Sequence, residues 1–171
     1  MIKQLKENIW QLHFRNFGSC VYLIKIPEKD KKIIIDTSSY EARDELLSDF
    51  EQLNIKPSKI DFVIITHSHW DHVGNLEIFK NAKTLDSGNL EEGRIKEIPE
   101  LSEIETIKTP GHSKDSLCIL YREVLFSGDT IFHNGFIGRV DLPGSSVKDM
   151  QESLEKVKTI NYEILAPGHL M

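Results

Sequence analysis

The stretch Thr66-His67-Ser68-His69-Trp70-Asp71-His72 decides the interpretation of this sequence. It places three histidines and one aspartate within a few positions, directly after the apolar run at residues 60–66. A nearly unbroken apolar run of this length is typical of a strand that is buried on both faces. Imidazole nitrogens and carboxylates are the ligands that zinc and related divalent metals take in proteins. The stretch therefore predicts a metal site at the end of a buried strand.

Three further segments place a metal-ligating residue type at the end of a predicted strand. They are Pro110-Gly111-His112, Gly128-Asp129-Thr130 and Pro167-Gly168-His169. The glycine in each segment lets the backbone turn tightly, so that the neighbouring ligand projects from the strand edge. We therefore expect these two histidines and this aspartate to join the ligands of the first stretch.

Strand-like and helix-like segments are interleaved along the chain. Short runs rich in Ile, Val and Tyr predict strands at residues 9–14, 20–26, 32–36, 60–66, 104–108, 117–121, 124–127 and 163–166. Helical spacing and caps predict helices at 38–54, from the metal motif to about residue 80, and at 147–160, the last capped by Ser145 or Ser146. The first helix would be capped by Ser38 or Ser39. Residues 86–103 are interpreted as loops or a short hairpin. The alternation predicts an α/β fold in a single domain, residues 1–171.

Composition excludes several classes of protein. Hydrophobic residues make up 39% of the 171 residues and charged residues 28%, which is ordinary for a folded soluble domain and excludes disorder. No apolar run approaches the roughly 20 residues of a membrane span, and the N-terminus resembles no secretory signal, so we expect a cytoplasmic protein. The net charge of −6, without a basic block, disfavours nucleic acid and anionic membranes as partners. The oligomeric state stays open.

The set His67-x-His69-x-Asp71-His72, followed by His112, Asp129 and His169, resembles the ligand set of the metallo-β-lactamase fold superfamily. The resemblance runs from the strand at 20–26 to His169. It implies an αββα sandwich of two mixed β-sheets flanked by helices. It also implies two metal ions per chain, zinc first, with iron or manganese as alternatives. The first metal would be held by His67, His69 and His112, the second by Asp71, His72 and His169, and Asp129 would bridge them.

The segment at residues 137–145, which includes Gly138-Arg139-Val140-Asp141, is similar to that of short, glyoxalase II-like (hydroxyacylglutathione hydrolase-like) hydrolases. This resemblance implies a thioesterase that cleaves S-acylglutathione thioesters, such as S-lactoylglutathione, with a metal-bridging hydroxide that Asp71 orients as the catalytic residue. Arg139 would bind a substrate carboxylate in a bidentate fork, or else form a structural ion pair with Asp141. His133 is a second predicted substrate contact. Trp70 is expected to pack beneath the site rather than to contact substrate.

Two alternatives stay open beside the thioesterase. The same ligands could serve a lactonase, another ester hydrolase, or a mononuclear iron persulfide dioxygenase, since such dioxygenases share a related Gly-Arg-x-Asp stretch. The chain could also be a non-catalytic domain that metal stabilises. Iron content and sulfite production would separate the dioxygenase from a hydrolase. Each of the enzymatic hypotheses implies a small molecule as the substrate.

Overall fold

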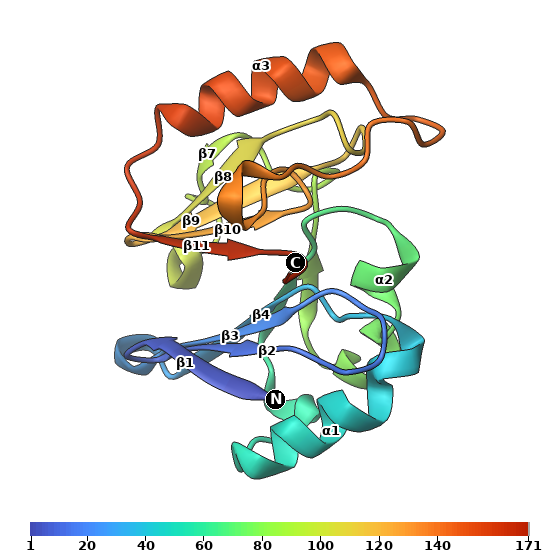
Figure 1. Cartoon of the computed structure of the whole chain (residues 1–171). Helices are drawn as coiled ribbons and strands as arrows, with labels where there is room; N and C mark the ends of the chain where they lie inside the picture. Colours follow the sequence, from blue (N-terminus) through green and yellow to red (C-terminus); the bar gives the residue numbers. More distant parts are fainter. Residues whose placement is uncertain (171) are drawn as a thin grey trace. The chain divides into compact units, whose positions relative to one another are not determined.

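The computed structural model describes residues 1–170, which form two compact units (Figure 1). The first unit contains residues 1–65 and 69–85, and the second contains residues 66–68 and those from 86 onward. Each unit is built on its own β-sheet. The assignment of the chain to one domain stays a prediction.

The sheet of the first unit is mixed and has the strand order β1-β2-β3-β4-β5-β6. The strands β1 to β4 pair antiparallel, whereas β4, β5 and β6 run parallel to one another. Parallel pairing of Ile35 in β4 with Ile64 in β5 puts the carboxyl ends of both strands at the same edge of the sheet. The bounds are β1 (Ile2–Lys6), β2 (Ile9–Leu12), β3 (Val21–Ile26), β4 (Lys31–Ile35), β5 (Phe62–Ile64) and β6 (Lys83–Leu85).

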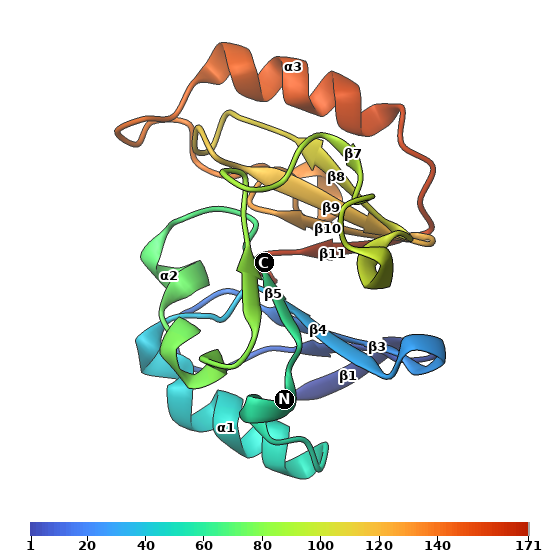
Figure 2. The ribbon, with the colours of Figure 1, turned by 180° about the vertical axis from the view of Figure 1, so that it is seen from behind.

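Helix α1 (Arg43–Gln52) lies along one face of this sheet (Figures 1 and 2). Its buried residues Leu46 and Phe50, four positions apart, share one core cluster with residues of β3, β4 and β5. The predicted helix at 38–54 begins later than expected, after a 3₁₀ turn at Tyr40–Ala42. The predicted serine cap is wrong, because the hydroxyl of Ser39 donates to the carbonyl of Phe17 instead.

The sheet of the second unit is also mixed and has the order β11-β10-β9-β8-β7. Only β10 and β11 pair parallel within it. Helix α3 (Val147–Lys158) packs on the sheet through Val157, which contacts a cluster of Ile107, Cys118 and Leu125. The strand bounds are β7 (Gly93–Arg94), β8 (Ile104–Lys108), β9 (Leu117–Tyr121), β10 (Val124–Gly128) and β11 (Ile164–Pro167).

The helix predicted to follow the metal motif is much shorter than expected. Helix α2 (Trp70–Val73) is followed only by a 3₁₀ turn at Leu76–Phe79. The backbone N–H of Gly74 donates to the carbonyl of Ser38, and the side-chain amide of Asn75 donates to the carbonyls of Thr37 and Ser39. These bonds tie the backbone to the segment after β4, so the helix ends.

Within residues 1–170, no helix is long and apolar enough to cross a bilayer.

Candidate metal centre

In the first unit, hydrogen bonds from two distant segments hold the backbone of Asp71 and His72, the two ligand candidates of α2. The backbone N–H and the hydroxyl of Thr37 both donate to the carbonyl of His72, at 2.7 and 3.0 Å. From the other side, the N–H of Ser19 donates to the carbonyl of Asp71 at 3.0 Å. The backbone of both candidates is therefore fixed by chain segments that lie far from them in sequence.

The orientation of the His72 ring is set by Asp36. Oδ2 of Asp36 lies 2.7 Å from Nδ1 of His72, and both side chains are buried. A carboxylate at Nδ1 accepts its proton and leaves Nε2 as the ligand atom, which is the usual arrangement behind a metal-binding histidine. Nε2 of His72 is itself buried. This buried nitrogen fits a metal ligand.

Sequence reasoning missed Asp36. The local signal was an aspartate at the end of the predicted strand 32–36, a buried strand that runs beside β5. Since parallel neighbours end at the same sheet edge, that aspartate could have been placed near the metal motif.

In the second unit, His67 and His112 lie close together. Their rings are nearly perpendicular, with centroids 4.9 Å apart. Nδ1 of His112 donates to the carbonyl of Arg139 at 2.8 Å, which leaves Nε2 as the ligand atom. Nδ1 of His67 lies 3.1 Å from the hydroxyl of Thr66.

Asp129 lies between two histidines of the same unit. Its Oδ2 is 3.4 Å from Nε2 of His112 and 3.6 Å from Nε2 of His169. Both separations exceed the usual length of a hydrogen bond. Two ligands that each lie about 2.1 Å from one zinc ion in tetrahedral geometry are about 3.4 Å apart. The separations therefore fit donor atoms that share metal ions.

Two glycines allow close backbone approaches beside the ligands. Gly128 has a φ of 48°, and a Cβ on it would lie 2.7 Å from the hydroxyl of Thr66. A Cβ on Gly138 would lie 2.1 Å from the carbonyl oxygen of Asp129 and 2.9 Å from Nδ1 of His112. Gly138 also donates its N–H to that carbonyl at 3.1 Å. The segment at 137–145 is thereby joined to the ligands through its backbone.

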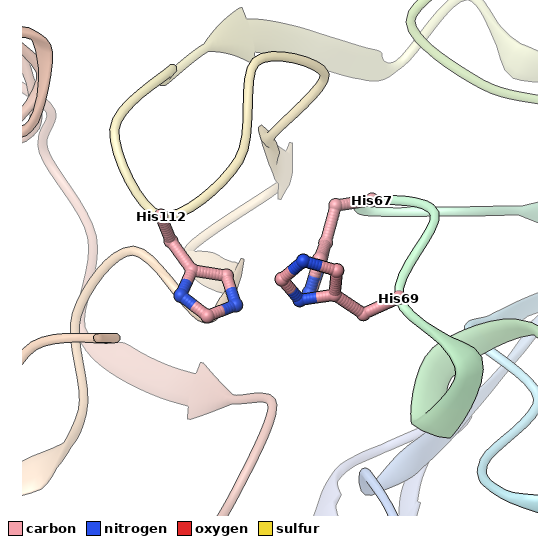
Figure 3. Close-up of side chains that lie close together, drawn as sticks. All are labelled: His67, His69 and His112. Atoms are coloured by element: carbon pink, nitrogen blue, oxygen red, sulfur yellow. The ribbon is translucent and has the colours of Figure 1, made fainter. Parts of the chain in front are cut away.

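All seven predicted metal ligands belong to groups whose donor atoms lie within 4.8 Å of one another. Imidazole and carboxylate donors suit zinc, iron or manganese, and the groups are consistent with a site for two metal ions. The assignment of each residue to a first or second metal stays a prediction. The three groups are His67, His69 and His112; His67, His72 and Asp129; and Asp71, His72 and His169. Figure 3 draws the group of His67, His69 and His112.

The predicted substrate contacts lie outside these groups. Arg139 forms a bidentate ion pair with Asp141, with two N–O distances of 2.9 Å, and both side chains are exposed. His133 is exposed in a 3₁₀ turn. Substrate binding by Arg139 and His133 stays a prediction. The expectation that Trp70 packs beneath the site is wrong, because this residue is 57% exposed and its ring stacks on Phe17.

Comparison with known proteins assigns the family. The model of the metallo-beta-lactamase superfamily matches residues 15–88 and 85–169, which together cover most of the chain. The chain belongs to the metallo-beta-lactamase superfamily.

Two solved structures show its fold. ETHE1 from Myxococcus xanthus superposes with a TM-score of 0.76 at 22% identity, over 100% of this chain and 76% of the other. TTHA1623 in a di-iron-bound form gives 0.74 at 23% identity, over 94% and 93%. The predicted fold, with two mixed sheets and helices, is confirmed.

Sequence relatives in this superfamily include hydrolases. Two probable metallo-hydrolases of Methanocaldococcus jannaschii are 33% and 32% identical to this chain. The first match covers 80% of this chain and 70% of the relative, and the second covers 94% and 92%. Hydroxyacylglutathione hydrolase 1 of Vibrio vulnificus is 33% identical over 82% of this chain and 58% of its own length. Family, relatives and donor groups together support a metal-dependent hydrolase.

Proposed function

We propose that this metal-dependent hydrolase of the metallo-β-lactamase superfamily is a thioesterase of the glyoxalase II type, which cleaves S-acylglutathione thioesters. The observation that carries the proposal is the 33% identity to hydroxyacylglutathione hydrolase 1 of Vibrio vulnificus over 82% of this chain. An atrochrysone carboxyl ACP thioesterase of Aspergillus fumigatus is a further relative, at 28% identity. Its name also points to a thioester substrate.

The proposed ligands divide into two sets. His67, His69 and His112 would hold one metal ion, Asp71, His72 and His169 would hold the other, and Asp129 would contact both. Metal ions held in this way lower the pKa of water towards about 7 and polarise a carbonyl group. Zinc is the metal we expect first, and iron or manganese would suit the same donors.

The protein's own residues prepare this site in two ways. Asp36 and the carbonyl of Arg139 each accept an Nδ1 proton, from His72 and His112, so that the Nε2 atoms are presented as ligands. Asp71 would orient the attacking water through its carboxylate. Addition of water to the acyl carbon and cleavage of the C–S bond release a carboxylic acid and a thiol, so no oxidant or reductant is required.

Glutathione carries two carboxylates, and Arg139 is the proposed contact for one of them, with His133 beside the substrate. To bind substrate, the guanidinium of Arg139 would exchange its exposed partner Asp141 for the ligand carboxylate. Arg139→Ala should then raise KM for S-lactoylglutathione. It should leave KM unchanged for a thioester whose thiol part has no carboxylate. An equal effect on both substrates would contradict this role of Arg139.

The test is hydrolysis of S-lactoylglutathione by the metal-replete full chain, beside a sample treated with chelator. We expect chelator-sensitive turnover with kcat/KM of about 10⁴ M⁻¹ s⁻¹ or more, which is ordinary for an enzyme. Turnover should return when zinc, iron or manganese is restored. A metal-loaded protein that cleaves no thioester overturns the proposal. Hydrolysis of lactones, or sulfite production from a persulfide with bound iron, would then identify which alternative holds.

A further inference from the structure

We propose that Asp115 is a positioning residue for metal binding, whose carboxylate fixes the loop after β5 against the loop after β8. These loops carry His67 and His112. The inference rests on the proposed role of these two histidines as metal ligands. Asp115 belongs to none of the three donor groups found within residues 1–170, so its effect would pass through the residues it binds.

The carboxylate of Asp115 accepts one hydrogen bond from each loop. The backbone N–H of Ser68 donates to Oδ2 at 2.9 Å, across 47 positions of sequence. The hydroxyl of Ser113 donates to Oδ1 at 2.7 Å. Asp115 therefore connects the residue that follows His67 with the residue that follows His112.

The bond to Ser68 acts on a backbone unit that includes His67. The nitrogen of Ser68 lies in the same rigid peptide plane as the carbonyl and Cα of His67. A fixed Ser68 N–H therefore restricts the orientation of that plane and the starting point of the His67 side chain. The ring of His67 already meets the ring of His112 at 4.9 Å between centroids. Small rotations of this plane would change how the two rings face one another.

Further hydrogen bonds stabilise the loop after β8, which carries Asp115. The hydroxyl of Ser116 accepts the N–H of Ser113 at 3.2 Å and lies 2.8 Å from its hydroxyl. The N–H of Leu117 donates to the carbonyl of Thr66 at 2.8 Å. Asp115 thus projects from a loop that has its own internal hydrogen bonds and is also bonded to the loop after β5.

The charge of Asp115 strengthens its two bonds. Partial burial by itself raises the pKa of Asp115, but the hydrogen bonds from Ser113 and Ser68 outweigh this effect and leave the pKa below its usual value. The side chain is therefore ionised near neutral pH, and bonds to an ionised acceptor are stronger than bonds between neutral groups.

The experiment measures Zn²⁺ affinity of the metal-free full chain by competition with a chromophoric chelator. Asp115→Ala should weaken one Zn²⁺ binding step by about 10- to 100-fold, which is the usual effect of losing a partner behind the ligands. Asp115→Asn keeps an acceptor for the Ser68 N–H and should restore most of the affinity. If Asp115→Ala fails to fold, a small but measurable loss of affinity in Asp115→Asn, which lacks the charge that strengthens both bonds, supports the inference, and an affinity equal to that of the wild type overturns it.

Asp61→Ala is the matched control. Asp61 also accepts a backbone N–H from a distant segment, that of Lys32 at 2.9 Å, and pairs with Lys31. It precedes β5, whereas the metal motif follows that strand. This variant should bind Zn²⁺ like the wild type, and its metal-free melting temperature controls for a general loss of stability.

Each outcome separates this inference from the proposed function. Unchanged Zn²⁺ affinity in Asp115→Ala, or an equal loss in Asp61→Ala, overturns the inference even if the wild type hydrolyses thioesters. A wild type that binds Zn²⁺ but cleaves no thioester overturns the proposed function, and the affinity loss in Asp115→Ala would still support the inference. A wild type that binds none of Zn²⁺, iron and manganese refutes both.

Discussion

Removal of the Asp36 carboxylate should weaken metal binding, although Asp36 lies far from the metal motif in sequence. Asp36 lies 36 positions before His72, yet its Oδ2 is 2.7 Å from Nδ1 of that ring. The His72 side chain is fully buried, and the side chain of Asp36 is only 2% exposed. Bulk water therefore has almost no direct contact with this pair in the wild type.

Two costs follow from the substitution Asp36→Ala. The Nδ1–H of His72 would be left buried without its acceptor, which costs about 1–3 kcal/mol of folding free energy. The ring would also lose the partner that fixes its ligand atom, which lowers metal affinity about 10- to 100-fold. At 1.36 kcal/mol for each factor of ten, that loss is about 1.4–2.7 kcal/mol of binding free energy. Asp36→Asn retains one acceptor oxygen and should lose less on both counts.

Chelator competition on the metal-free full chain measures the affinity, and urea unfolding in excess chelator measures the stability. Asp49→Ala is the control, because Asp49 is equally buried in the same unit but pairs with the α-amino group of Met1. We expect this variant to lose stability and keep its metal affinity. Wild-type Zn²⁺ affinity in Asp36→Ala would refute the reasoning that Asp36 orients His72 for metal binding.

Three further predictions test the surroundings of the site. Gly138→Ala should lower the free energy of unfolding by about 1–3 kcal/mol in urea, because its Cβ would meet the Asp129 carbonyl at 2.1 Å; an unchanged midpoint would contradict this close approach. Ser146→Ala should cost about 1 kcal/mol in the same assay, since the Ser146 hydroxyl accepts the N–H of Asp149 at the start of α3; no change would show that this bond does not stabilise the helix. Burial raises the pKa of the Cys118 thiol, so less of the reactive thiolate is present at pH 8 than in an exposed cysteine. Cys118 should therefore resist a thiol reagent until the protein unfolds, and rapid labelling of the native protein would rule this out.

The sequence predicted those features that depend on local pattern. The strands expected at 104–108 and 117–121 have the bounds of β8 and β9, and α3 begins at the expected Val147 after its Ser146 cap. Each of these segments combines a clear hydrophobic period with a recognisable boundary. The ligand candidates were found for a related reason, since each lies beside a glycine or a buried strand.

Features that depend on distant segments were missed. Strand β1 is partly exposed and has no strong apolar alternation, and its pairing with β2 decides its conformation. Helix α2 stops early because Gly74 and Asn75 bond to the segment after β4. Asp36 and Asp115 act across 36 and 47 positions of sequence. The end of the predicted strand 32–36 indicates only that Asp36 lies near the sheet edge of the metal motif. The hydrogen bonds of Asp36 and Asp115 themselves have no local pattern, because the fold brings these residues and their partners together.

The most direct test of the proposed metal site is the metal content of the purified full chain after equilibrium dialysis, compared with that of Asp129→Ala. In the structure, Oδ2 of Asp129 lies near the Nε2 atoms of both His112 and His169. We predict about two metal ions per wild-type chain, as in two-metal hydrolases, and a clear loss in the variant. A wild type without bound metal, or an Asp129→Ala variant with the same content, would contradict the site.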